Sequence, residues 1–167
     1  MTEAQTAGGH ALAMALRKAY LAMHRHADAA LEPFGVTANQ YVVLAVLDNQ
    51  DGLSQRELVE RASSDANTIR PILAALQKKA FVVRNAHPAD RRAWSVKLTR
   101  AGRVAFAEMR QGSDAFRHQL MEPFKASEAQ SFAIFLDRVA RAMTQPATQL
   151  RVKRLQGKRS TSSRQVL

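Results

Sequence analysis

Two short helical patterns separated by a three-residue polar break occupy residues 53–80. Ser54 followed by Glu57 is the signature of a capping box, which predicts that a short helix begins there. The break comprises residues 63–65, and Asp65 can cap a second helix. Two helices joined by so short a turn are typical of a helix-turn-helix, a motif that positions its second helix in the major groove of DNA.

The second helix, expected over residues 65–80, has an apolar face and a polar face. Its apolar positions fall at helical spacing and are Ile69, Ile72, Leu73 and Leu76. The polar face and the start of the preceding helix supply candidate DNA contacts, namely Ser54, Gln55, Asn67, Thr68, Arg70 and Lys78. Arginine and asparagine typically read guanine and adenine edges, and lysine meets phosphate. The pattern therefore indicates a recognition helix.

A short basic β-hairpin is predicted directly behind these helices. Apolar and polar residues alternate in two runs, as in half-buried strands, with apolar positions at Val82, Val83, Trp94, Val96 and Leu98. The connecting turn runs from His87 to Asp90, and Arg84, Arg91 and Arg92 lie on the hairpin. Guanidinium groups on a narrow ribbon suit a minor groove and its phosphates. For an isolated hairpin, a solvated surface role would be about as probable as DNA contact; the preceding helices favour DNA contact.

The net charge of +11 at pH 7 is concentrated in two segments. Residues 56–100 carry ten Lys or Arg against four acids, and residues 151–167 carry six Lys or Arg and no acid. Basic residues that served only solubility would be spread more evenly. The distribution is that expected of a surface that binds phosphate.

Long helical patterns flank this region. Before it, a helix over residues 11–31 is indicated by apolar residues at three- and four-residue intervals, and Thr37 with Gln40 forms a capping box that opens another helix. After it, Thr99 starts a helix with a weak point at Gly112. A further capping box, Ser127 with Gln130, is expected to open a last helix with an apolar side of Phe132, Phe135, Leu136, Val139 and Met143.

The run from Thr37 to Gly102, about two-fifths of the chain, resembles the winged helix-turn-helix core of the MarR family of bacterial transcription regulators. The matching pieces are Thr37-Ala-Asn-Gln-Tyr41, Gly52-Leu-Ser-Gln-Arg-Glu-Leu58, Asp65 with Thr68 and Ile69, Leu73 with Leu76, and Asp90-Arg91-Arg92-Ala93 leading into Val96-Lys97-Leu98-Thr99 and Gly102. Their joint occurrence in this order is specific to the family, although each piece alone would be weak.

Two positions depart from the family pattern. Ala80 and Phe81 stand where the family usually has Gly then Leu, so the turn into the first wing strand is expected to differ in shape. Pro71 lies inside the recognition helix and removes one backbone hydrogen bond, but similar proteins carry proline there and we expect it to be tolerated.

The resemblance implies a mainly α (α+β) protein with a winged helix-turn-helix core and long N- and C-terminal dimerisation helices. We expect a flexible N-terminus over residues 1–9, a single domain over residues 10–150, and a disordered basic tail over residues 151–167. Within the domain, residues 36–99 form the winged helix-turn-helix, and residues 10–35 and 100–150 form the dimerisation helices. A homodimer would match a palindromic double-stranded operator. The alternative is that the terminal helices fold back on their own chain.

The resemblance also implies regulation, most often as a repressor, by a small phenolic or aromatic carboxylate bound between the dimerisation helices and the winged module. Met23, His24, Ala27 and Tyr41 are candidates to line that cleft, and His24 or Arg17 could meet a carboxylate. The alternative, that these residues are packed or solvated without any ligand, is about equally supported by the sequence.

Other classes of function find little support. The chain has no cysteine and none of the common nucleophile, phosphate-binding or zinc-protease motifs, so we expect no enzyme, no thiol-based sensing and no cofactor. Its five histidines do not suggest a metal site. It has neither a signal peptide nor an apolar run long enough to span a bilayer, which predicts a cytoplasmic protein without membrane contact. Two alternatives remain: a sequence-tolerant architectural DNA-binding protein without effector, and a winged domain used only for protein contacts.

Overall fold

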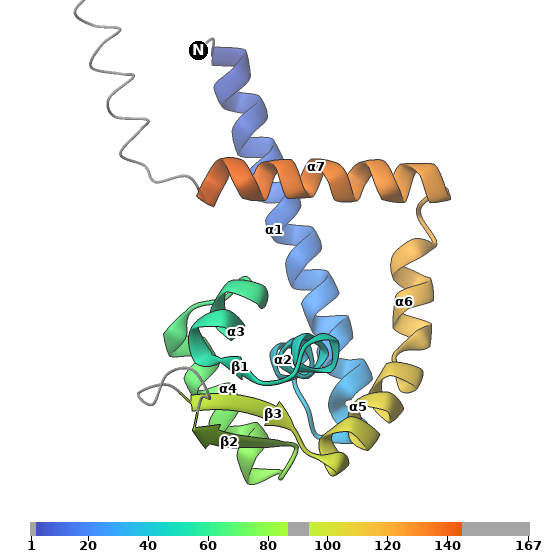
Figure 1. The fold of residues 1–167 in the computed structure, drawn as a ribbon. Coiled ribbons are helices and arrows are strands. Elements are labelled where there is room, and N and C mark those ends of the chain that lie inside the picture. Colours follow the sequence, from blue (N-terminus) through green and yellow to red (C-terminus); the bar gives the residue numbers. More distant parts are fainter. Residues whose placement is uncertain (1–2, 87–93, 145–167) are drawn as a thin grey trace, which may run out of the picture. The chain divides into compact units, whose positions relative to one another are not determined.

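The computed structural model describes residues 3–86 and 94–144 (Figure 1). The described residues divide into two compact units, with the boundary between Leu120 and Met121. The elements of the first unit are α1 (Glu3–Leu31), η1 (Glu32–Phe34), α2 (Ala38–Asn49), β1 (Leu53–Ser54), α3 (Gln55–Arg61), α4 (Ala66–Lys78), β2 (Val82–Ala86), β3 (Trp94–Leu98), α5 (Arg100–Gly112) and α6 (Asp114–Met121, ending at the boundary). The second unit contains α7 (Ala126–Thr144).

Local capping starts α2, α3 and α4, as the sequence predicts. Thr37 and Gln40 form a reciprocal capping box at the start of α2, and Ser54 and Glu57 form another at the start of α3. The Asp65 side chain accepts hydrogen bonds from the first turn of α4. Each cap satisfies backbone N–H groups that have no partner within the helix, so each boundary is set by residues no more than three positions apart.

A three-stranded antiparallel sheet in the order β1-β3-β2 packs on the helices around one core. In the wing hairpin, formed by β2 and β3, Val82 pairs with Leu98 and Arg84 pairs with Val96. The inner ends of the hairpin belong to the core, whose fully or almost fully buried side chains include Val43, Leu44, Leu47, Leu53, Leu58, Ile69, Leu73, Leu76, Val82, Val96, Phe106 and Met109. Figure 1 shows the hairpin beside α4, which it contacts through β2.

Polar contacts fasten the base of the hairpin to α5. Asp51 Oδ1 accepts a hydrogen bond of 2.8 Å from the Leu98 N–H, and its other oxygen forms an ion pair with Arg103. The Thr99 hydroxyl donates to the Ala80 carbonyl oxygen at 2.7 Å and accepts from the Gly102 N–H at 2.9 Å. Because one side chain serves both the end of α4 and the start of α5, these contacts set the direction in which the hairpin leaves the core.

The exit from α4 is a Schellman turn built around an alanine. Ala80 has a φ of 57°, and its N–H donates to the Gln77 carbonyl oxygen while the Phe81 N–H donates to that of Leu76. Glycine usually occupies this left-handed position because it has no Cβ. Ala80 and Phe81, which replace the usual Gly-Leu pair, therefore form the kind of turn that glycine favours. Pro71 is likewise contained within an uninterrupted α4.

Three helices or strands differ from the sequence-based expectation. The first helix, expected over residues 11–31, begins at Glu3, because Gly8 and Gly9 lower helix stability without supplying a stop. Ser127 and Gln130 do not open α7. Instead, Glu128 accepts a hydrogen bond of 2.8 Å from the Lys125 N–H, and the helix begins at Ala126. Trp94, expected to be half-buried, is 61% exposed, whereas Val96 on the same side of the strand is only 1% exposed, because the strand extends past the edge of the core at Trp94.

Several large apolar side chains remain exposed on the helices outside the core. On α1 they include Leu12, Met14, Tyr20, Leu21 and Met23, and on α7 they include Phe132, Ile134, Phe135, Leu136 and Met143. In the described part of the chain, no single helix meets the length and apolarity required to cross a membrane. Residues Ala7–Phe34 and Ala38–Asn49 meet them only when taken together, across a bend of 77°.

Candidate nucleic-acid interface and adjoining cleft

One side of α4 is buried and the other is exposed and basic. Ile69, Leu73 and Leu76 are at most 1% exposed, which fixes the rotation of the helix on the core. The exposed side carries Asn67, Arg70, Pro71, Ala74 and Lys78. There is no acidic residue between positions 66 and 79, so this side can approach a polyanion without repulsion. Three of the predicted DNA contacts, Asn67, Arg70 and Lys78, therefore share one open face.

Asp65 holds the first turn of this helix. Its Oδ1 accepts from the Asn67 N–H at 2.8 Å and from the Thr68 N–H at 3.0 Å, and its Oδ2 accepts from the Thr68 hydroxyl at 2.7 Å. These bonds, the one from the Thr68 hydroxyl first, lower the pKa of Asp65 below its ordinary value. The carboxylate is thus the favoured form, and it orders the turn that carries Asn67.

Other predicted contacts are committed to internal bonds or half-buried. The Ser54 hydroxyl donates to Glu57 Oε2 at 2.7 Å within the capping box, and the Thr68 hydroxyl is bonded to Asp65. Gln55, the first residue of α3, is half-buried. Ser54 and Thr68 thus hold the starts of α3 and α4 in shape, and the side chains of all three residues are less free to reach a ligand than those on the open face of α4.

On the wing hairpin, Arg84 pairs directly with Val96, so its side chain starts on the core-facing side of the sheet. Arg84 is half-buried, and among the described residues its Nε has no hydrogen-bond partner. Trp94 lies on the same side, two residues further out, opposite Ala86. Arg91 and Arg92 fall outside the described residues, so their role at the tip stays a prediction.

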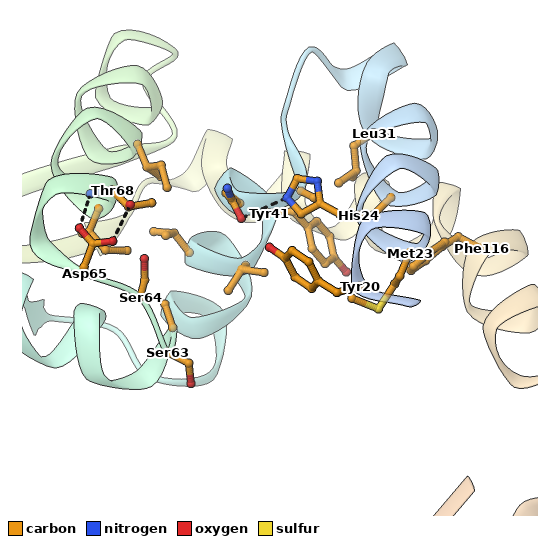
Figure 2. A pocket seen from close by; sticks show the side chains of 18 residues that line it. Tyr20, Met23, His24, Leu31, Tyr41, Ser63, Ser64, Asp65, Thr68 and Phe116 are labelled. Carbon is orange, nitrogen blue, oxygen red and sulfur yellow. Dashed lines mark hydrogen bonds between the residues drawn. The ribbon is translucent and has the colours of Figure 1, made fainter. Parts of the chain in front are cut away.

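A cleft of about 750 Å³ opens between α1, α2 and the turn joining α3 to α4. Figure 2 shows Tyr20, Met23 and His24 on one wall and Ser63, Ser64, Asp65 and Thr68 on the opposite wall. Its other lining residues are Ala27, Leu31, Ala38, Asn39, Tyr41, Val42, Val43, Ala62, Ile69, Ile72 and Phe116. The cleft thus reaches the cap of the helix that carries the open basic face.

His24 and Asp28 tie the α1 wall to the start of α2. His24 Nδ1 lies 3.0 Å from Asp28 Oδ2, and Asp28 Oδ1 accepts a hydrogen bond of 2.7 Å from the Ala38 N–H. His24 Nε2 lies 3.4 Å from Asn39 Oδ1 (Figure 2). The four-residue spacing of His24 and Asp28 could have suggested their pairing, whereas nothing local in the sequence indicates Asn39 as a neighbour.

The cleft gathers most of the residues predicted to meet an effector. Met23, His24, Ala27 and Tyr41 all line it. Arg17 does not, because it lies on a separate shallow hollow along α1 with Met14, Lys18 and Leu21. Sequence reasoning missed Phe116 and the turn residues 62–65, which reach the cleft only through the packing of the helices.

The central region of the chain is similar to known transcription regulators. The MarR family model matches residues 36–94. The regulator SarZ from Staphylococcus aureus is 34% identical over 74 residues, which cover 44% of this chain and 50% of SarZ. The match therefore spans about half the length of that curated relative.

Solved structures resemble a larger part of the chain. The transcriptional repressor CouR of Rhodococcus jostii, bound to a 23-mer DNA duplex, is 25% identical with a TM-score of 0.72, covering 77% of this chain and 92% of CouR. BpsR of Bordetella bronchiseptica is 25% identical with a TM-score of 0.71, covering 77% of this chain and 98% of BpsR. The DNA binding of BpsR is regulated by 6-hydroxynicotinic acid.

Proposed function

We propose that this chain, whose residues 36–94 match the MarR family, is a sequence-specific DNA-binding transcriptional repressor acting in the cytoplasm. The observation that carries the proposal is the open side of α4, where Asn67, Arg70 and Lys78 stand together without an acid on the helix. A capped second helix presenting such a face is what major-groove reading requires.

In this proposal, Asn67 and Arg70 read base edges from the first two turns of α4, and Lys78 contacts a phosphate. Ser54, Gln55 and Thr68 support the helix-turn-helix and add contacts with the DNA phosphate backbone at its edge. Arg84 approaches the DNA phosphate backbone between the major and minor grooves, and Arg91 and Arg92 enter the minor groove. Support for these roles comes from the exposure of the α4 residues and from the DNA-bound relative CouR.

We further propose a homodimer that binds a palindromic operator. The large apolar side chains exposed on α1 and on α7 support it, because such side chains are typical of helices that pack against a second copy. A two-fold protein meets two half-sites about one helical turn, or roughly 34 Å, apart. Sedimentation at micromolar concentration tests this part, and a monomer would contradict it.

The cleft is the proposed effector site. Its volume lies within the usual range for small-molecule sites, and it joins α1 to the cap of α4. A ligand that binds one arrangement of these elements more tightly than another shifts the population toward it and changes the fit to two half-sites. The regulation of BpsR DNA binding by a small aromatic acid supports an aromatic effector.

The test is a gel-shift titration of the full chain on palindromic operator duplexes, selected from random sequences, and on unselected duplex. We expect a preference for the selected sequence of at least about a thousandfold, the lower end of the range for specific regulators. Equal affinity for both duplexes would favour the architectural alternative, and no salt-dependent binding would favour protein contacts alone.

Two substitutions distinguish base-specific recognition from nonspecific electrostatic attraction to phosphate. Arg70→Ala should relax the preference at one position in each half-site by about 1–3 kcal/mol. Lys78→Ala, on the same face, is the matched control and should weaken binding to every sequence equally. An equal loss on all sequences for Arg70→Ala would restrict Arg70 to phosphate contact.

A further inference from the structure

The cleft contains a carboxylate and no permanent cation. Of the described residues that line it, none is lysine or arginine, and the ionisable acid among them is Asp65. Within the described part of the chain, no Lys or Arg forms an ion pair with Asp65. Its three hydrogen bonds come from neutral groups, two backbone N–H groups and the Thr68 hydroxyl.

His24 does not supply the missing positive charge. Its Nδ1 faces Asp28 Oδ2 at 3.0 Å, and Asp28 is held in place by the Ala38 N–H. A protonated His24 is therefore balanced by Asp28, and a neutral His24 leaves the Asp28 charge uncompensated. In either state, the formal charges of Asp65, His24 and Asp28 sum to a negative value. This negative charge opposes a carboxylate ligand and favours a cation.

The rest of the lining suits an aromatic cation. Tyr20, Tyr41 and Phe116 contribute ring surface, and the Tyr20 ring lies 5.6 Å from the His24 ring between centroids. Aromatic faces attract cations, and aliphatic residues such as Ile69 and Ile72 complete an apolar wall. Figure 2 shows the aromatic residues of α1 and α2 across the cleft from Asp65.

We propose that the ligand of this cleft is an aromatic amine, protonated at neutral pH, whose ammonium group contacts Asp65 and whose ring lies against Tyr20 and Tyr41. This inference rests on the proposed effector role of the cleft and defines its ligand class. It replaces the carboxylate ligand that the family resemblance implies. Of the two residues expected to meet a carboxylate, Arg17 lies outside the cleft, and His24 faces Asp28.

The same geometry connects the ligand to α4. Asp65 is both the acid of the cleft and the cap of that helix. An ammonium group bound to Asp65 Oδ2 competes with the Thr68 hydroxyl, which donates to the same oxygen. Occupancy of the cleft therefore acts on the first turn of α4, where Asn67 and Arg70 begin the open face.

Three indole compounds of nearly equal shape provide the test: tryptamine, which is cationic, tryptophol, which is neutral, and indole-3-acetate, which is anionic. Their affinities for the full-length protein are measured by isothermal titration calorimetry. We expect tryptamine to bind at least about tenfold more tightly than indole-3-acetate, the scale of one charge-assisted hydrogen bond, with tryptophol between them. Equal or tighter binding of indole-3-acetate would overturn the proposal.

Asp65→Asn isolates the charge, because asparagine is about as good an N-cap as aspartate. In this variant the preference for tryptamine over indole-3-acetate should fall to about twofold or less, whereas tryptophol should bind as before and so confirm an intact cleft. Asp48→Asn, on the exposed side of α2 and away from the cleft, is the matched control and should keep the preference. A preference retained in Asp65→Asn would remove Asp65 from the site.

The outcomes separate this inference from the proposed function. Binding of the acid in place of the amine overturns the charge class and leaves an effector cleft in place. Failure of all three compounds to bind overturns the ligand class as proposed. Neither result bears on DNA binding, because the gel-shift titration measures DNA affinity independently, without any ligand.

Discussion

Gly102 in the first turn of α5 lies directly against the carbonyl group of Phe81. A Cβ at position 102 would overlap the Phe81 oxygen and lie 2.9 Å from its carbonyl carbon. The same oxygen accepts a hydrogen bond of 3.0 Å from the Thr99 N–H. The wing hairpin and α5 can therefore meet at this distance only when residue 102 has no side chain.

Gly102→Ala should destabilise the protein by about 1–3 kcal/mol, because backbone rather than a flexible side chain would have to move. The measurement is the free energy of unfolding in urea. Gly9→Ala is the control, since the Gly9 position has nothing within 4 Å of an added Cβ and lies in α1. That change should stabilise by about 0.5–1 kcal/mol, and a similar loss in both variants would contradict the close approach.

Ala80→Gly should raise stability by about 0.5–1 kcal/mol. Relief of the left-handed conformation at φ 57° outweighs the extra freedom that glycine gives the unfolded chain. The same substitution at Ala74, exposed in the middle of α4, should instead cost about 1 kcal/mol. Thermal unfolding of the two variants should shift in opposite directions, and a loss of stability in Ala80→Gly would argue against the Schellman turn.

Acid should weaken the start of α4 through Asp65. Hydrogen bonds from the Thr68 hydroxyl and from backbone N–H groups lower the pKa of this carboxyl in the folded state. Its stabilising effect is therefore present above the ordinary value near 3.8 and is lost as the pH falls through the lower folded-state pKa. The asparagine in Asp65→Asn does not titrate.

The thermal midpoints of the wild type and of Asp65→Asn should be compared from neutral pH down to about pH 2, within the range where carboxylates titrate. We expect the thermal midpoint of the wild type to fall relative to that of Asp65→Asn as the Asp65 carboxyl becomes protonated. A difference that stays constant over the whole series would contradict the role of the carboxylate.

The wing should contribute through Arg92. Arg92→Ala is expected to weaken operator binding by about 1–3 kcal/mol, on the scale of a lost charged hydrogen bond, with little change in sequence preference. Trp94 offers a second readout, because it is the only tryptophan in the chain and is 61% exposed on the hairpin. Its emission should change when duplex is added, and unchanged affinity in Arg92→Ala would remove that arginine from the interface.

Much of the architecture could be predicted from local patterns. The caps at Thr37, Ser54 and Asp65 and the two strands of the hairpin follow from residues close together in sequence. These features are satisfied within one turn of helix or by one alternating run, so they depend little on distant parts of the chain. The buried and exposed sides of α4 follow from the same periodicity.

Local patterns were less reliable where two of them competed. Lys125 and Glu128 open α7 two residues before Ser127 and Gln130 could do so, although both spacings are those of a cap. Alternation alone would also group Trp94 with Val96, and only the extent of the core separates a buried side chain from an exposed one.

Capping and periodicity act over three or four residues, so the order of residues alone was enough to specify a helix-turn-helix followed by a basic hairpin. Which side chains meet in the cleft depends instead on the folded chain. Asp65 and His24 are far apart in the sequence and line one cleft because α1 lies across that cleft from the turn between α3 and α4, whereas Arg17 on the same helix lies outside the cleft. The charge that a ligand encounters there depends on how whole helices pack, and no local pattern encodes it.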